Sequence, residues 1–224
     1  MPAELRLIGQ EMRTPRAAGL AGIVFALLLM TSDAMIWHYV PSAAEARRAV
    51  IAQHSTLLRI ALNLRPFAGI AFLWFMGVIR DRLGNLEDQF FATIFLGSGV
   101  LYVAMMFLSG AMSHAVLTLL TTGSPTLMTS SSYDLARQEV FAITAVYATR
   151  MAGVFMMSTS TILMQTRTTP RWVAILGYVL ALVLLLSTSY RAWLALAFPL
   201  WVMLVSRWMI LVRNGALKAD SSSA

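Results

Sequence analysis

Charged and strongly polar side chains lie within or beside the long apolar segments of this chain, and they are the first candidates for chemistry. The most conspicuous are Asp33, Arg59, Asn63, Arg65 and Arg150. A charge inside a lipid bilayer is costly unless it finds a partner, so such residues usually face the interior of a helix bundle. Arginine suits a phosphate or carboxylate there, because its planar guanidinium matches their geometry.

These residues are expected to share one layer of the membrane. At ~1.5 Å rise per residue, Asp33, Asn63, Arg65 and Arg150 lie roughly 22–26 Å above one edge of a ~30 Å hydrocarbon core. In one interpretation Asp33 pairs with Arg150 as a structural contact, while Arg59 and Arg65 extend to lipid headgroups. In the other, the layer is an outward-open polar cavity with excess positive charge, which receives an anionic lipid or solute.

A second group of residues combines imidazole and thioether side chains. His38, His54 and His114 all fall on the same predicted side of the membrane, and Met35 and Met112 lie close to two of them in sequence. This ligand set suits Cu(I). However, the chain has 15 methionines, and methionine commonly fills gaps in apolar cores. We therefore expect no metal site and no cofactor.

Enzymatic chemistry is not favoured by the remaining residues. Asp33 is the one carboxylate expected inside a span, and the hydroxyl run Ser158–Thr161 has no base beside it in sequence. Hydroxyls in spans more often bond to carbonyls of their own helix. The chain has no cysteine, and its single lysine, Lys218, lies in the tail. A catalytic thiol and an intramembrane Schiff base are therefore excluded.

The elements that would position these residues follow from composition. The chain has 224 residues, of which 58% are hydrophobic and 12% charged, with a mean hydropathy of +0.72. These values predict an all-α, polytopic integral membrane helix bundle. Its net charge of +7 is attributed to orientation in the bilayer and not to nucleic acid, because the basic residues gather at the ends of apolar segments. Their bias towards arginine is typical of a GC-rich bacterial genome.

Six transmembrane helices are predicted, in a single domain over residues 17–213. A span needs ~20 apolar residues, and the predicted spans are 17–40, 57–79, 90–108, 140–165, 172–186 and 193–212. Residues 1–16 form a polar N-terminal segment and residues 214–224 a disordered tail. A long polar connection is expected over residues 109–139.

One further helix is expected outside the hydrocarbon core. Ser42 and Glu45 have the spacing of a capping box, which starts a helix at about Ala43. Its apolar positions follow helical spacing up to about Thr56, with charged residues off the stripe. This pattern predicts an extracytoplasmic amphipathic helix at the membrane surface.

The basic residues also predict an orientation in the cell membrane. With six spans, one side carries Arg6, Arg13, Arg16, Arg80, Arg82, Arg167, Arg171, Arg207, Arg213 and Lys218. Cytoplasmic loops are enriched in basic residues. Both termini are therefore expected in the cytoplasm.

The turn after the second predicted span carries a motif-like string. Gly77, Asp81, Arg82 and Gly84 have the spacing of the beginning of the G-x-x-x-D-R/K-x-G-x-R/K-R/K motif. The string resembles that loop motif of major facilitator superfamily transporters, and this resemblance implies transport. The sequence departs from the motif where 86–87 reads Leu-Glu instead of a basic pair.

Two classes of function remain open. The first is a small permease, or a lipid- or anion-binding protein, for an anionic or lipid-like solute, working as a homo-oligomer. The second is a non-catalytic subunit or assembly partner of a larger membrane complex.

Overall fold

The structure is a computed structural model that describes residues 14–40, 50–51, 53–83, 89–122, 130–166, 169–187 and 192–221. Within these ranges the chain folds into helices alone, with no strand, as predicted. The helices are α2 (Thr14–Tyr39), α4 (Ser55–Leu83), α5 (Gln89–Thr122), α6 (Ser130–Ala142), η2 (Ile143–Ala148), α7 (Thr149–Thr166), α8 (Arg171–Leu186) and α9 (Ala192–Ser221).

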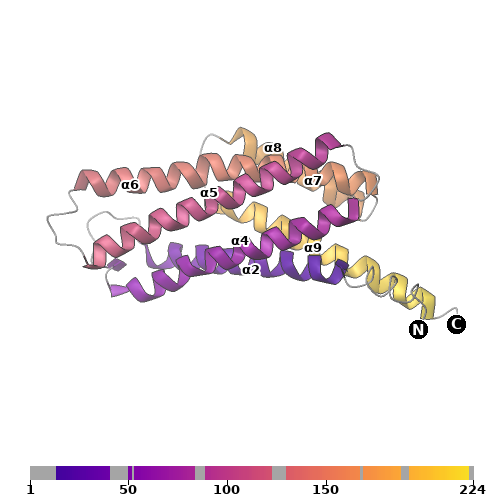
Figure 1. Ribbon diagram of the computed structural model, residues 1–224, viewed down its shortest axis with the longest axis horizontal. Coiled ribbons are helices and arrows are strands. Elements are labelled where there is room, and N and C mark those ends of the chain that lie inside the picture. The colour runs from indigo at the N-terminus through magenta and orange to yellow at the C-terminus, as the bar shows by residue number, and fades with distance from the viewer. Residues whose placement is uncertain are drawn as a thin grey trace.

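Three of these elements form one continuous helix, because the π-helical turn η2 joins α6 directly to α7. The protein therefore has six helices in its described part. Five are long and apolar enough to cross a membrane, and α8 is shorter at 16 residues. Successive helices run in opposite directions, and the start of α2 and the end of α9 lie at the same end of the bundle (Figure 1). A chain whose two ends lie at the same end of the bundle crosses it an even number of times. The shorter α8 therefore counts as the sixth helix of a multi-pass membrane protein.

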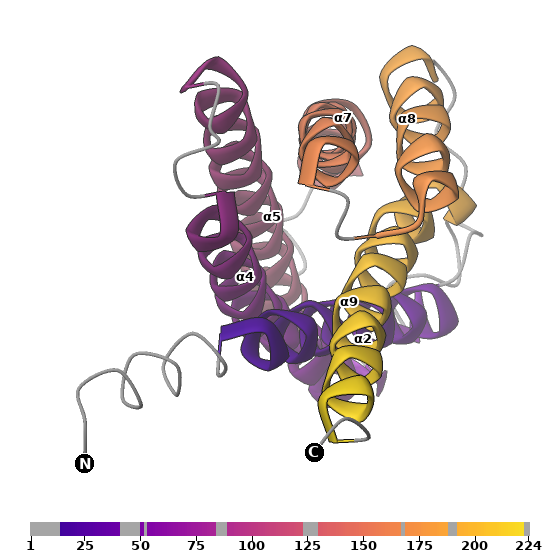
Figure 2. The same ribbon diagram turned by 90° about the vertical axis from the view of Figure 1, so that its right-hand side faces the viewer.

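The helices form a closed ring, in which α2 contacts α4 and each helix packs against the next until α9 returns to α2. Figure 2 shows this ring viewed along its axis, from the end that carries the start of α2. We call this the termini end, and the opposite end, with the α5–α6 connection, the far end.

An aromatic cluster fills the centre of the ring. Phe25, Phe72, Tyr102, Phe155 and Phe198 come from five different helices, and each is at least 93% buried. Phe25 and Phe72 have ring centroids 4.8 Å apart, and those of Tyr102 and Phe198 are 4.7 Å apart. Tilted and edge-on aromatic contacts of this kind stabilise a core beyond their buried area.

Small residues allow the helices around this cluster to approach closely, and Gly22 of α2 is an example. A Cβ atom at Gly22 would collide with the Ser206 hydroxyl of α9 and with the Phe75 ring of α4. Interfaces between transmembrane helices commonly use small residues in this way. The close packing of α2 against α9 therefore depends on glycine at this position.

The long polar connection predicted over residues 109–139 is wrong. α5 continues to Thr122 and α6 begins at Ser130. The hydroxyls that make this stretch look polar are satisfied within the helix: Ser113 donates to the Ser109 carbonyl at 2.8 Å and Thr118 to that of His114 at 2.9 Å. A helix can therefore carry them at little cost.

The continuation of these helices has a consequence for the shape of the bundle. The 34 residues of α5 extend roughly 50 Å at the usual rise, against a hydrocarbon core of ~30 Å. Figure 1 shows α5 and α6 reaching further towards the far end than α8 and α9. The bundle is therefore longer, along the helix axes, on the side of α2, α4, α5 and α6.

Some predicted features lie outside the described residues. These include the capping box of Ser42 and Glu45, most of the amphipathic helix, the N-terminal segment before Thr14 and the turn at 84–88. At the end of the amphipathic segment, the His54 amide donates to the Val50 carbonyl at 3.0 Å, leading into α4. α9 continues to Ser221, past the predicted end of the last span at residue 212.

Candidate functional site

A buried arginine on α4 forms the centre of the candidate site. The Arg65 guanidinium donates to the Asp33 carboxylate of α2 at 2.9 Å, and the two side chains are 11% and 13% exposed. Its Nε lies 3.4 Å from the Ser32 hydroxyl, and its Nη1 donates to the Ser109 hydroxyl of α5 at 3.2 Å. Arg65 therefore joins three helices through one side chain.

The hydrogen-bond network continues from Ser109 to the π-helical turn. The hydroxyls of Ser109 and Thr144 lie 2.8 Å apart, and Thr144 also donates to the Val140 carbonyl at 2.9 Å. The Thr149 hydroxyl donates to the Thr144 carbonyl at 2.9 Å. π-helical turns occur frequently at functional sites. Here the turn brings a hydroxyl to the same network as the buried ion pair.

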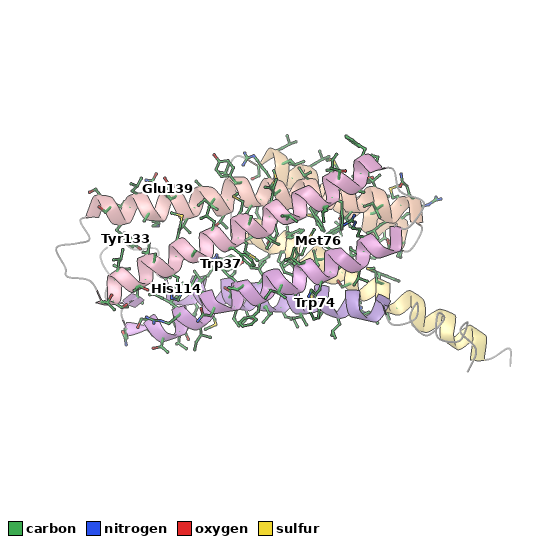
Figure 3. The ribbon with its side chains drawn as sticks, in the orientation of Figure 1. Trp37, Trp74, Met76, His114, Tyr133 and Glu139 are labelled. Atoms are coloured by element: carbon green, nitrogen blue, oxygen red, sulfur yellow. The ribbon has the colours of Figure 1, made fainter. Side chains whose placement is uncertain are left out.

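A cavity of about 440 Å³ opens on the far-end side of Arg65. We call it the outer cavity. It lies between α2, α4, α5, α6 and η2, and Figure 3 labels two of its lining residues, Trp37 and Tyr133. Its walls are mainly apolar, with Arg65 at one end and Arg137 on α6. The lining residues are Ile36, Trp37, Val40, Ile51, Leu58, Leu62, Arg65, Ser113, Val116, Leu117, Leu120, Tyr133, Ala136, Arg137, Val140, Phe141, Thr144 and Ala145.

A smaller cavity of about 50 Å³, the inner cavity, lies on the other side of Arg65. It reaches the aromatic cluster at Tyr102 and Phe198. Its polar lining comes from Asp33, Arg65, Ser109, Thr144 and Thr149. A cavity of this size, with several polar partners, has room for a few water molecules.

The structure brings together two of the predicted site residues and separates the others. Asp33 and Arg65 form the ion pair, whereas Arg59 and Asn63 lie exposed on α4. Arg59 and Asn63 do not line either cavity. The described part of the site therefore has Arg65, and not a layer of several arginines, at its centre.

The predicted contact between Asp33 and Arg150 is wrong. Arg150 donates to the Val146 carbonyl of its own helix at 3.0 Å, while Asp33 pairs with Arg65. Similar depth in the membrane was the basis of the prediction. Depth does not determine which side of a helix a residue occupies, because each residue turns the helix by about 100°. Arg65 and Asp33 lie at the same depth and also face each other.

Three hydroxyl residues of the network were not predicted as site residues. Ser32 is adjacent to Asp33, and Ser109 and Thr144 lie in or beside the stretch interpreted as a connection. Ser32 also donates to the Ala61 carbonyl of α4 at 2.7 Å. Extending the predicted helix 90–108 past residue 108 would have identified Ser109 as a candidate site residue. No comparable pattern in the sequence points to Thr144.

Two of the three histidines, His38 and His54, make aromatic contacts with Tyr39. The Tyr39 ring stacks on His54 at 4.9 Å and meets His38 edge-on at 4.8 Å. Among the described residues, no group of three or more histidine and carboxylate side chains has a geometry that holds a metal ion. The expectation that purified protein carries no stoichiometric metal stays a prediction for elemental analysis.

Three hydroxyls of the Ser158–Thr161 run on α7 bond to carbonyls of their own helix as predicted, whereas the buried Ser160 hydroxyl has no hydrogen-bond partner in the described part of the chain. Ser158 and Thr159 bond to the Phe155 carbonyl of their own helix at 3.0 and 2.7 Å. Thr161 adds a contact to the Tyr178 hydroxyl of α8 at 2.7 Å. These residues contribute to packing and lie outside both cavities.

Comparison of this chain with models of known protein families, with curated proteins and with solved structures gives no match. The resemblance of the 77–87 stretch to a transporter loop motif therefore has no wider similarity to accompany it.

Proposed function

We propose that this protein is a permease-like membrane protein that takes up an anionic, lipid-like solute in the outer cavity, with the acidic headgroup at Arg65. The observation that carries this proposal is the combination of an apolar cavity and a buried guanidinium at one end of it. The proposal rests on the chemistry of this site and not on similarity to a known protein family.

The charge of the cavity supports an anion. Among its described lining residues there are two arginines, Arg65 and Arg137, and no aspartate or glutamate. Asp33 balances Arg65 from the side of the inner cavity. Three of the five N–H donors of Arg65 have the partners described above, which leaves two for a ligand. Arginine presents such donors side by side to a carboxylate or phosphate.

The walls of the cavity support a solute with an apolar body. Ligand sites are typically ~300–1,000 Å³ in volume and combine apolar walls with a few polar groups that fix orientation. The outer cavity has this size and composition, with Leu58, Leu62, Val116, Leu117 and Leu120 among its lining residues.

We further propose that both termini are cytoplasmic and that the outer cavity lies on the extracytoplasmic side of the cell membrane. The distribution of basic residues supports this orientation. Reporter fusions after Lys218 and within Ser124–Ser132 should report opposite sides, with the first in the cytoplasm. Reversed reporters would contradict the proposed location of the cavity.

The experiment that tests binding uses a cysteine reporter in the outer cavity. Because the chain has no cysteine, Ala145→Cys introduces a single thiol among the cavity residues. In phosphatidylcholine nanodiscs, dodecyl phosphate should protect this thiol from a methanethiosulfonate reagent, and dodecanol should not. An anionic reagent should also react faster than a cationic one, after correction for their intrinsic rates. Equal protection by the neutral alcohol would contradict a role for the arginine.

Variants of two arginines on α4 provide the matched comparison. Arg65→Lys keeps the charge but loses the planar fork, so it should weaken protection by dodecyl phosphate. Arg59→Gln removes an exposed charge outside the cavity and should leave protection unchanged. Native mass spectrometry then tests the assembly. A homo-oligomer with bound anionic lipid supports the proposal, whereas co-purifying foreign subunits would favour the role of a complex subunit.

A further inference from the structure

The outer and inner cavities are separated by very few side chains. Among the described residues, only Arg65 and Thr144 line both cavities. One residue belongs to α4 and the other to η2. These two side chains therefore form a partition between an apolar compartment and a small polar one.

Ser109 holds both parts of this partition. Its hydroxyl accepts from Nη1 of Arg65 at 3.2 Å and lies 2.8 Å from the hydroxyl of Thr144. Ser109 is fully buried and lines the inner cavity only. It is thus the common hydrogen-bond partner of the two residues that separate the cavities.

The inner cavity is bounded towards the termini end by the aromatic cluster. Tyr102 and Phe198 line it and contact each other through their rings at 4.7 Å. Phe198 also packs against Phe25, Phe72 and Phe155. The inner cavity therefore has Arg65 and Thr144 on one side and densely packed rings on another, and Leu184 of α8 with Leu194 and Ala195 of α9 line its third side.

The contacts of Arg65 allow it to move without losing its ion pair. Nη2 binds Asp33, whereas Nη1 binds Ser109. Rotation of the guanidinium towards the outer cavity breaks the bond to Ser109 and can retain the bond to Asp33. Side chains change rotamer far more readily than helices move. An anionic group in the outer cavity gives Arg65 a second partner in that direction.

We propose that Arg65 and Thr144 form a gate, held closed by Ser109, and that opening the gate admits small polar molecules from the outer cavity to the inner cavity. This gate deepens the proposed function, on which it rests, because it supplies the next compartment on a path through the bundle. The inner cavity is lined by hydroxyls and the Asp33 carboxylate, so it suits water and not the apolar body of the solute.

Two cysteine reporters test the gate. Ala152→Cys lies in the inner cavity only, and Ala145→Cys lies in the outer cavity only. With Ser109 present, a small membrane-impermeant methanethiosulfonate should label Ala145→Cys and spare Ala152→Cys. Adding Ser109→Ala should accelerate labelling of Ala152→Cys by about tenfold to thirtyfold, because two hydrogen bonds are lost. Labelling of Ala145→Cys should change little.

Ser113→Ala is the matched control. Ser113 also lies on α5 and lines the outer cavity, but its hydroxyl donates to the Ser109 carbonyl and not to the partition. It should leave labelling of Ala152→Cys unchanged. Should Ala152→Cys not fold, Ala148→Cys, which also lines the inner cavity, replaces it.

Each outcome supports the gate or overturns it. Equal labelling at both positions with Ser109 present would show that no partition exists. Unchanged labelling of Ala152→Cys after Ser109→Ala would show that Ser109 does not hold it. These measurements use no solute, so they stand apart from the dodecyl phosphate experiment. Loss of protection by dodecyl phosphate would remove the proposed function and leave the labelling result intact.

Discussion

Replacing both members of the buried ion pair should destabilise the protein by less than the sum of the two single replacements. Arg65→Gln leaves the Asp33 carboxylate, only 13% exposed, without its 2.9 Å partner. It also removes the bonds to Ser32 and Ser109. Breaking a buried pair from one side costs about 3–5 kcal/mol, and the additional lost bonds put Arg65→Gln at the upper end of that range.

Asp33→Asn should cost less, because Arg65 keeps its bonds to the two serines. The double variant Asp33→Asn/Arg65→Gln removes both charges, so its loss should fall below the sum of the two single losses by a coupling free energy of about 2–3 kcal/mol. Arg150→Gln is the control. It loses one bond to a carbonyl of its own helix and should cost about 1 kcal/mol or less.

The assay is reversible unfolding in mixed micelles with increasing dodecyl sulfate, followed by loss of helical circular dichroism. The four variants and the parent protein then give a double-mutant cycle with its control. Additive losses for Asp33→Asn and Arg65→Gln would refute the interaction. A loss of stability for Arg150→Gln as large as that for Arg65→Gln would indicate that Arg150 lies in the bundle interior.

Two further predictions concern packing outside the site. Gly22→Val should destabilise the protein by about 1–3 kcal/mol in thermal unfolding, because the new side chain collides with Ser206 and Phe75. Gly97→Ala is the control and should show no comparable loss, because a Cβ atom there meets nothing within 4 Å. Tyr178→Phe should cost about 1 kcal/mol by removing the 2.7 Å contact with Thr161, and a loss that persists in the Thr161→Val background would disprove that coupling.

Much of the architecture follows from the sequence because apolar length and secondary structure are local properties. A run of ~20 apolar residues without charge has few alternatives to a transmembrane helix, since every backbone group must be hydrogen-bonded inside the bilayer. This reasoning predicted the six helices that the described part of the chain contains, five of which are long and apolar enough to cross a membrane. It failed over residues 109–139 because composition alone does not reveal that hydroxyls such as those of Ser113 and Thr118 bond back to their own helix.

The sequence by itself determined that Asp33 and Arg65 lie at the same depth in a helical membrane protein, because the rise of a helix converts residue number into distance along its axis. Only the tertiary structure decided that Arg65, and not Arg150, faces Asp33. The rotation of each helix and the choice of its neighbours depend on packing of the whole ring, to which contacts such as Gly22 against Ser206 contribute. The cavities on the two sides of Arg65 arise from that packing, and no local pattern in the chain encodes them.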